Sequence, residues 1–154
     1  MSATAEGPRA QAERFALLYL ENLALLVPLQ EVYSLEPVLD IDPTQRVGTS
    51  VGAVRSADSW FAVFSLSDNL EPCPTLPDAF RICAILARDG IAIALACRGV
   101  SSIAAAAVVR HAIPECMITA QSPVRALALH GNEVYCCTSV ADLVPVLDPL
   151  EEAA

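Results

Sequence analysis

Apolar segments occur in pairs across short polar breaks in this 154-residue sequence, and this pairing most constrains its fold. The breaks lie at residues 21–22, 56–59, 88–90 and 131–132 and contain Asn, Asp, Gly or Ser. Asn, Asp and Gly tolerate the left-handed conformations that tight turns require, so each pair predicts a β-hairpin. Tight turns join antiparallel strands, whereas parallel strands need long crossover connections. The pattern therefore predicts an all-β protein built of antiparallel hairpins.

A proline-rich segment at 71–78, EPCPTLPD, separates two of these hairpins from the other two. Proline lacks the backbone donor of a β-ladder, so this segment cannot be a central strand. We therefore predict one domain at 13–148 made of two small antiparallel β-barrel-like subdomains, at about 13–70 and 79–148. Residues 1–12 are expected to form a flexible tail, and residues 149–154 a second tail.

Two segments of the C-terminal half are candidates for helices. Residues 98–112 leave two structures open, because an alanine run favours a short helix and flanking Val and Ile favour extended backbone. Residues 139–147 predict a short terminal helix: Ser139 is a good N-cap, and Asp142 falls in the first turn. Pro145 limits its length.

Charge and hydropathy exclude several classes of partner. The net charge is −9, and all nine basic residues are scattered arginines, so we expect no nucleic-acid partner. No apolar run reaches the roughly 18 residues of a membrane-spanning helix, and we expect no membrane insertion. The N-terminus lacks a signal-peptide pattern, which predicts a cytoplasmic location. A hydrophobic fraction of 55% suggests apolar surface left over for a protein partner.

The six cysteines do not have the spacing of a metal site. No Cys-x-x-Cys pair occurs and no His stands at ligand spacing, so we predict no metal and no cofactor. Cys83, Cys97 and Cys136 or Cys137 lie within apolar strand patterns, where a free thiol behaves as a small hydrophobe. Reduced, structural thiols are expected.

Candidate catalytic groups are few. His111 and Cys116 are the only His and Cys near one another, and no nucleophile elbow accompanies them. Glu36, Asp40 and Asp42 lack the glycine and ligand spacing of a calcium loop and are interpreted as a solvated loop. We therefore predict no catalytic residues and a non-enzymatic protein.

The order of these elements resembles CheW-like domains, the adaptor modules of bacterial chemosensory arrays. Four segments carry the resemblance: FALLYLENLALLVPLQEV, VGAVRSADSWFAVFSL, FRICAILARDGIAIALACRGV and VRALALHGNEVYCCTSVADLV. The resemblance implies two small five-stranded barrels that share an interface. It also implies a signal-transduction adaptor whose partners are chemoreceptor-like or histidine-kinase-like proteins.

The central hairpin departs from the family pattern, which typically runs Gly-x-x-Asn-x-Arg-Gly and then Pro-Val-x-Asp-Leu. In register with Gly52, the places of Asn, Arg, Gly, Pro and Asp hold Arg55, Ala57, Asp58, Ala62 and Ser65. The scaffold-forming residues persist, and the residues that the resemblance links to receptor and kinase coupling are mostly changed. The chain therefore resembles a divergent member.

We predict that partner contacts involve Val32, Gly52, Arg55, Asp58 and Trp60. The preferred interpretation is a non-enzymatic adaptor or scaffold of a chemosensory or motility pathway. One alternative is a small-ligand-binding or enzymatic β-barrel protein that uses the cleft between the two subdomains. Another is a self-assembling structural protein, a homo-oligomer formed through an exposed strand edge.

Overall fold

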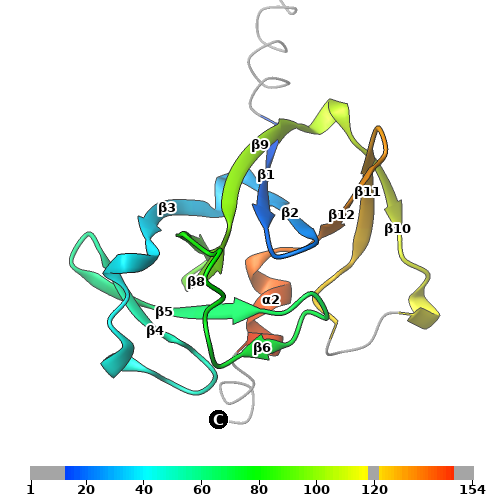
Figure 1. Cartoon of the computed structure of the whole chain (residues 1–154). Coiled ribbons are helices and arrows are strands. Elements are labelled where there is room, and N and C mark those ends of the chain that lie inside the picture. The colour runs from blue at the N-terminus through cyan, green and yellow to red at the C-terminus, as the bar shows by residue number, and fades with distance from the viewer. Residues whose placement is uncertain (1–12, 118–121, 148–154) are drawn as a thin grey trace, which may run out of the picture.

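The computed structural model describes residues 13–117 and 122–147, and it confirms the all-β prediction. The predicted tails at 1–12 and 149–154 lie outside the described residues. Sheet A has the strand order β10-β11-β12-β2-β1-β9 and sheet B the order β3-β7-β8-β5-β4 (Figure 1). Sheet A comprises β1 (Arg14–Tyr19), β2 (Ala24–Pro28), β9 (Gly99–Ala104), β10 (Val109–Ala112), β11 (Ala126–His130) and β12 (Glu133–Cys137). Sheet B comprises β3 (Val32–Pro37), β4 (Gly52–Ser56), β5 (Ser59–Leu66), β7 (Ile82–Arg88) and β8 (Ile91–Cys97).

All four predicted hairpins form, as the antiparallel pairs β1–β2, β4–β5, β7–β8 and β11–β12. Two of their turns place both central residues at positive φ. Ala57 and Asp58 have φ of 49° and 67°, and Asp89 and Gly90 have φ of 53° and 84°. Two successive positive φ values are the signature of the type I′ turn, whose twist matches that of the flanking strands.

The sheets differ from the expected arrangement in two respects. Each contains one short parallel contact, β12 with β2 and β5 with β8, which joins hairpins distant in sequence. In addition, each sheet takes strands from both sides of the proline-rich segment, so the sheets do not coincide with the halves 13–70 and 79–148. Backbone pairing between segments far apart in sequence carries no local sequence signal.

The expected barrels are not closed, and this part of the prediction is corrected. No ladder joins the two edge strands of sheet B, β3 and β4. Side chains bridge them instead: the Ser56 hydroxyl donates to Glu36 Oε2 at 3.1 Å and approaches the Ser34 hydroxyl at 3.3 Å. A β-bulge between Val32 and Ser34 breaks the register of β3 with β7. A bulge bends its strand and increases twist, which favours this side-chain closure over a continuous ladder.

The ambiguous segment at 98–112 is extended rather than helical. It forms β9, a single 3₁₀ turn η4 (Ala105–Ala107) and β10. β9 pairs with β1 along its whole length and includes only the first alanine of the run 104–107, whose other three residues form the 3₁₀ turn. The proline-rich segment contributes only β6 (Pro72–Cys73), a two-residue strand beside the end of β5.

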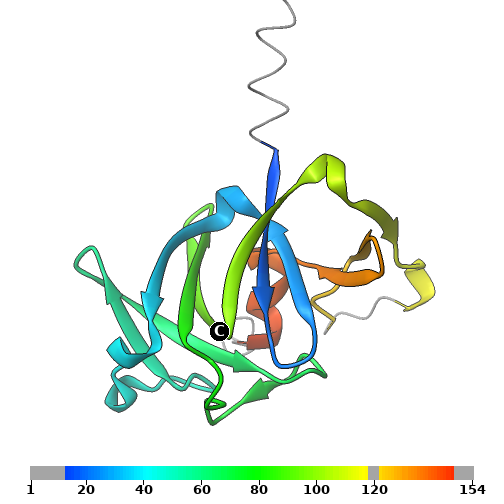
Figure 2. The ribbon, with the colours of Figure 1, turned by 45° about the horizontal axis from the view of Figure 1, so that its top comes forward.

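The predicted terminal helix is present as α2 (Val140–Leu147), and it packs against β7 and β8 (Figure 2). Leu143 and Leu147 are fully buried in a core that also takes residues from both sheets. A smaller cluster, which includes Leu17, Leu26 and Tyr135, lies within sheet A. Within the described residues, no helix is long and apolar enough to span a membrane.

One buried charge connects these elements. Glu31 closes the 3₁₀ turn η1 (Leu29–Glu31) between β2 and β3, and only 1% of its surface is exposed. Its Oε1 accepts a hydrogen bond from the backbone N–H of Val140 at 2.8 Å, at the start of α2. Its Oε2 lies 3.1 Å from Nη1 of Arg88, at the end of β7. A carboxylate at a helix N-terminus also interacts favourably with the helix dipole.

Removing this carboxylate is expected to destabilise the protein. Glu31→Ala leaves the Val140 amide without its acceptor and a cavity beside α2, so we expect unfolding free energy to fall by about 2–4 kcal/mol. Urea denaturation followed by circular dichroism measures this change. Glu133→Ala, at an exposed strand position, is the control and should change stability by less than about 0.5 kcal/mol. Equal effects of the two substitutions would refute the role assigned to Glu31.

Candidate interaction surface

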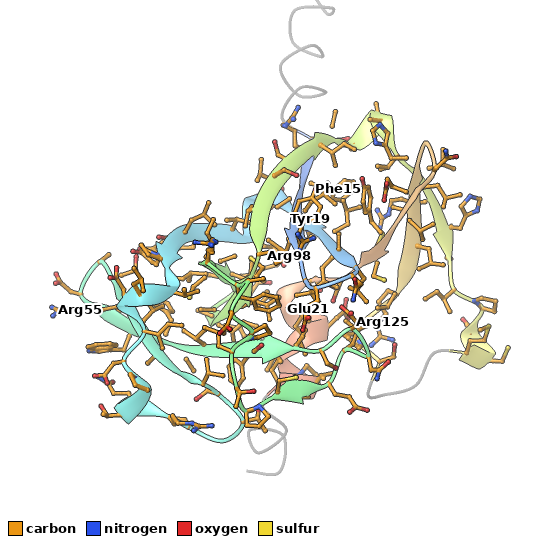
Figure 3. All side chains as sticks on the ribbon, in the orientation of Figure 1. Phe15, Tyr19, Glu21, Arg55, Arg98 and Arg125 are labelled. Carbon is orange, nitrogen blue, oxygen red and sulfur yellow. The ribbon has the colours of Figure 1, made fainter. Side chains whose placement is uncertain are left out.

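The β4–β5 hairpin brings three of the five predicted contact residues together. Arg55 and Trp60 are directly opposite each other across the strand pair, and Asp58 lies in the turn. The Arg55 Nη2 atom is 3.0 Å from Asp58 Oδ1, and both side chains are largely exposed. Trp60 is 48% exposed. Figure 3 shows Arg55 at the end of the hairpin, on the opposite side of the view from Arg125. We call Arg55, Asp58 and Trp60 the hairpin surface.

A groove adjoins Trp60 on the outer side of the hairpin. Its volume is about 460 Å³, and it is lined by Ala53, Trp60 and Ala62 from the strands and by Gln45, Arg46 and Val47 from the preceding loop. Arg46 fixes this loop by donating to the backbone carbonyls of Ser50 and Pro74. Trp60 and Val47, which is 62% exposed, make the groove partly apolar. Such a concave apolar surface with a charged border suits a protein contact.

Gly52 lies inside the fold rather than on this surface. The loop residue Asp42 pairs with Ala53 through two backbone hydrogen bonds, which draws the loop onto β4. A Cβ atom at position 52 would lie 2.6 Å from the Asp42 carbonyl oxygen and 2.7 Å from Ile41 Cγ2. The φ of +153° is also rarely adopted by residues with a side chain. Gly52 therefore supports the hairpin surface from beneath.

Gly52→Ala should destabilise the protein by about 2–3 kcal/mol, because the backbone of Asp42 would have to move away from β4. Thermal or urea unfolding checks this expectation. Gly99→Ala is the matched control, since a Cβ there meets nothing within 4 Å and no unusual φ is required. Gly99→Ala should shift stability by less than about 1 kcal/mol. A Gly52→Ala variant as stable as Gly99→Ala would contradict the close approach.

Val32 is half-buried and packs against the core, so the structure does not bring it to the hairpin surface. Its neighbour Tyr33 is 57% exposed, and its ring centroid is 6.1 Å from that of Phe61 on β5. Leu35, further along β3, is 48% exposed. Sequence reasoning did not identify Tyr33 and Leu35 as exposed side chains. The alternation of side chains along VYSLEP indicates that the two faces of β3 differ. Which of these faces is covered depends on the bulge and on the neighbouring strand.

Two of the three carboxylates of the 36–42 segment, those of Glu36 and Asp42, have structural partners, and Asp40 is exposed. Glu36 accepts hydrogen bonds from Ser34 and Ser56. Asp42 caps the 3₁₀ turn η3 (Pro43–Gln45), and hydrogen bonds from the hydroxyl and backbone N–H of Thr44 lower its pKa. No group of three or more His, Cys, Asp or Glu side chains is placed to hold a metal ion among the residues that the structure describes.

The structure separates His111 and Cys116 into different elements. His111 lies on β10, and Cys116 lies in the 3₁₀ turn η5 (Glu115–Met117); both are exposed. Neither side chain takes part in a hydrogen bond within the described part of the chain. This pair therefore shows no nucleophile–base geometry.

All six thiols are free, and those of Cys83, Cys97 and Cys137 are buried in strands, as predicted. Burial raises the pKa of both Cys83 and Cys97 to about 12, and the charges of Glu36 and Asp40 add to the effect at Cys83. Burial also raises the pKa of Cys136 and Cys137. A thiolate is the reactive form of cysteine, so these four thiols are poor nucleophiles.

Alkylation should therefore discriminate between the thiols. Iodoacetamide at about pH 8 should modify the exposed Cys116 in the folded protein and leave Cys83 and Cys97 unmodified until urea unfolds it. At that pH, a thiol with a pKa of about 12 is ionised to only about one part in 10⁴. Peptide mass mapping gives the extent of modification at each site. Rapid labelling of Cys83 without denaturant would contradict its burial.

Comparison with known proteins identifies the fold but gives no match by sequence. No protein-family model matches the chain, and no curated protein matches it. Among solved structures, the crystal structure of the scaffolding protein TtCheW from Thermoanaerobacter tengcongensis is similar, with a TM-score of 0.61. The alignment covers 83% of this chain and 89% of that protein, at 13% sequence identity. The fold is CheW-like.

The similarity to TtCheW extends over most of both chains, so it includes both sheets and not a single hairpin. This confirms the resemblance that the order of hairpins indicated. The departures at Arg55, Ala57, Asp58 and Ser65 occur within the CheW-like fold. Ser65 is fully buried, and its hydroxyl has no hydrogen-bond partner within the described residues.

Proposed function

We propose that this protein is a non-enzymatic adaptor or scaffold of a bacterial chemosensory or motility pathway and acts in the cytoplasm through protein–protein contacts. The similarity of its fold to a scaffolding protein carries this proposal. The partners proposed are chemoreceptor-like and histidine-kinase-like proteins.

The hairpin surface is the proposed contact region. Trp60 offers a large side chain with few rotatable bonds on a strand whose backbone is already ordered, which lowers the entropy lost on binding. Arg55 is next to it and offers a charge-assisted donor, although Asp58 partly neutralises it. Aromatic residues and arginine contribute most often to the energy of protein interfaces.

The proposed mechanism is linkage between two partners bound at different faces. Both sheets and α2 share one continuous core, so a partner bound to sheet B contacts a body rigidly joined to sheet A. A rigid adaptor holds its partners in a fixed relative orientation, and each partner then biases the conformational equilibrium of the other.

The changed polar residues narrow the choice of partners. An arginine at position 55 and an aspartate at 58 present the partner with a different charge pattern from the family's central hairpin. Charge patterns of this kind determine specificity and association rate more than total affinity. We propose that this adaptor serves partners whose contact surface has changed in a complementary way.

A pull-down from a lysate of the source organism tests this function, with the tagged full-length protein as bait and mass spectrometry as readout. We expect recovery of a chemoreceptor-type or kinase-type protein. Trp60→Ser should weaken its binding by about 30-fold, as expected for loss of a central aromatic residue, and Arg55→Glu should also weaken it. Val134→Ser, similarly exposed but on β12, is the matched control and should bind normally.

Two outcomes would contradict different parts of the proposal. Failure to recover any receptor-type or kinase-type protein would contradict the adaptor role. Equal binding by the wild type and the Trp60→Ser and Arg55→Glu variants would instead contradict the assignment to the hairpin surface. Because both residues are exposed, all variants should retain wild-type unfolding curves.

A further inference from the structure

The β4–β5 hairpin projects from the molecule and has the groove at its base. Figures 1 and 2 both show the hairpin turn extending past the other strands of sheet B. Ala53 and Ala62 are paired across the two strands and give the groove a floor of small side chains. Val47 and Trp60 border this floor, and both are exposed. A concave surface with exposed apolar walls indicates an interaction site.

Arg46 gives the groove a positive charge that no carboxylate neutralises. Its Nε and Nη2 atoms donate to the backbone carbonyls of Ser50 and Pro74, at 3.2 and 3.1 Å. It forms no ion pair within the described part of the chain. The two carbonyl contacts already hold the guanidinium in place. Its remaining N–H groups can therefore bind an incoming carboxylate with little further loss of side-chain entropy.

A matching carboxylate lies at the tip of the same hairpin. The Asp58 side chain is 93% exposed, and its Oδ1 is 3.0 Å from Arg55 Nη2. Its Oδ2 takes part in no hydrogen bond among the described residues. Arg55 and Trp60 are directly opposite each other and share one face of the strand pair. The Asp58 carboxylate therefore lies on the face that also bears the groove.

These groups are evenly spaced along the hairpin. Trp60 is two residues from Ala62, at the level of the groove floor, and two residues from Asp58, at the tip. A strand rises about 3.3 Å per residue, so the tip and the groove lie at similar distances on either side of Trp60. A two-fold axis through Trp60 would therefore place the tip of each hairpin over the groove of the other copy.

We propose that a second copy of this chain occupies the groove, in a two-fold dimer formed by the outer faces of the two hairpins. The Trp60 side chains pack against each other at the centre. Asp58 of each copy meets Arg46 of the other copy through Oδ2, and Arg55 stays paired with Oδ1 on its own chain. A surface whose acidic and basic groups are exchanged by a two-fold axis is complementary to itself, which favours a second copy over an unrelated protein.

The dimer covers the hairpin surface, so self-association excludes another protein from Trp60 and Asp58. Only the monomer then binds the proposed partner, and the dimer is a reserve form. This consequence rests on the proposed function, whereas the dimer itself does not. The two failures are distinguishable, because sedimentation of the purified protein involves no other protein and the pull-down does not measure self-association.

Sedimentation equilibrium of the purified full-length protein tests the dimer. Because few side chains take part, we expect a monomer–dimer equilibrium with a dissociation constant of about 10–100 µM. Trp60→Ser should raise this constant at least about tenfold, since it removes the central aromatic contact. Val134→Ser, similarly exposed but on β12, is the matched control and should dimerise like the wild type.

A charge exchange tests the pairing of Asp58 with Arg46. In Asp58→Arg two arginines face each other across the contact, and in Arg46→Glu two carboxylates do, so each variant alone should be monomeric. An equimolar mixture of the two variants has an opposite-charge pair at both ends and should associate about as strongly as the wild type. Glu133→Arg, which changes the net charge as Asp58→Arg does, is the control and should dimerise normally.

Three results would overturn the proposed dimer. The first is a wild-type protein that stays monomeric up to about 500 µM, well above the expected dissociation constant. The second is self-association of folded Trp60→Ser or Asp58→Arg as strong as that of the wild type. The third is a mixture of the two folded charge variants that fails to associate. Trp60→Ser and Asp58→Arg leave the contacts of Arg46 with its loop intact, so they test the dimer even if Arg46→Glu does not fold.

Discussion

The buried carboxylate of Glu31 is the contact on which the relative placement of the main elements depends. A charge with 1% of its surface exposed is stable only when hydrogen bonds replace its lost hydration. Here the replacement comes from the first amide of α2 and from the guanidinium at the end of β7. The short turn between β2 and β3 is thereby tied to the helix and to sheet B. Apolar packing is non-directional, so a directional contact of this kind helps to select one arrangement of helix and sheets.

The hairpin surface shows how this fold leaves side chains available. On sheet B, the close approach of Asp42 to Gly52 buries the first half of β4, and the strands then extend past the loop so that Arg55 and Trp60 remain exposed.

Local chemistry explains which elements could be predicted. The turn residues Asp89-Gly90 and Gly131-Asn132 identify their hairpins because few residues adopt positive φ without strain. Ser139 and Asp142 similarly identify the beginning of α2, and the Ser139 side chain does contact the Asp142 amide. Within the candidate surface, Arg55, Asp58 and Trp60 were predicted because they lie within one hairpin. Val32 is half-buried and Gly52 is buried, and this burial depends on packing from distant segments.

The sequence by itself determined the class of the protein, its four hairpins and its terminal helix, because turns, caps and alternation act over a few neighbouring residues. Only the tertiary structure decided how the hairpins join into two open sheets through β12–β2 and β5–β8. It also decided that residues 98–112 form two strands joined by a 3₁₀ turn. These features depend on contacts between segments separated by many residues. Such contacts form through backbone hydrogen bonds and shared burial, which carry no local signal in the sequence.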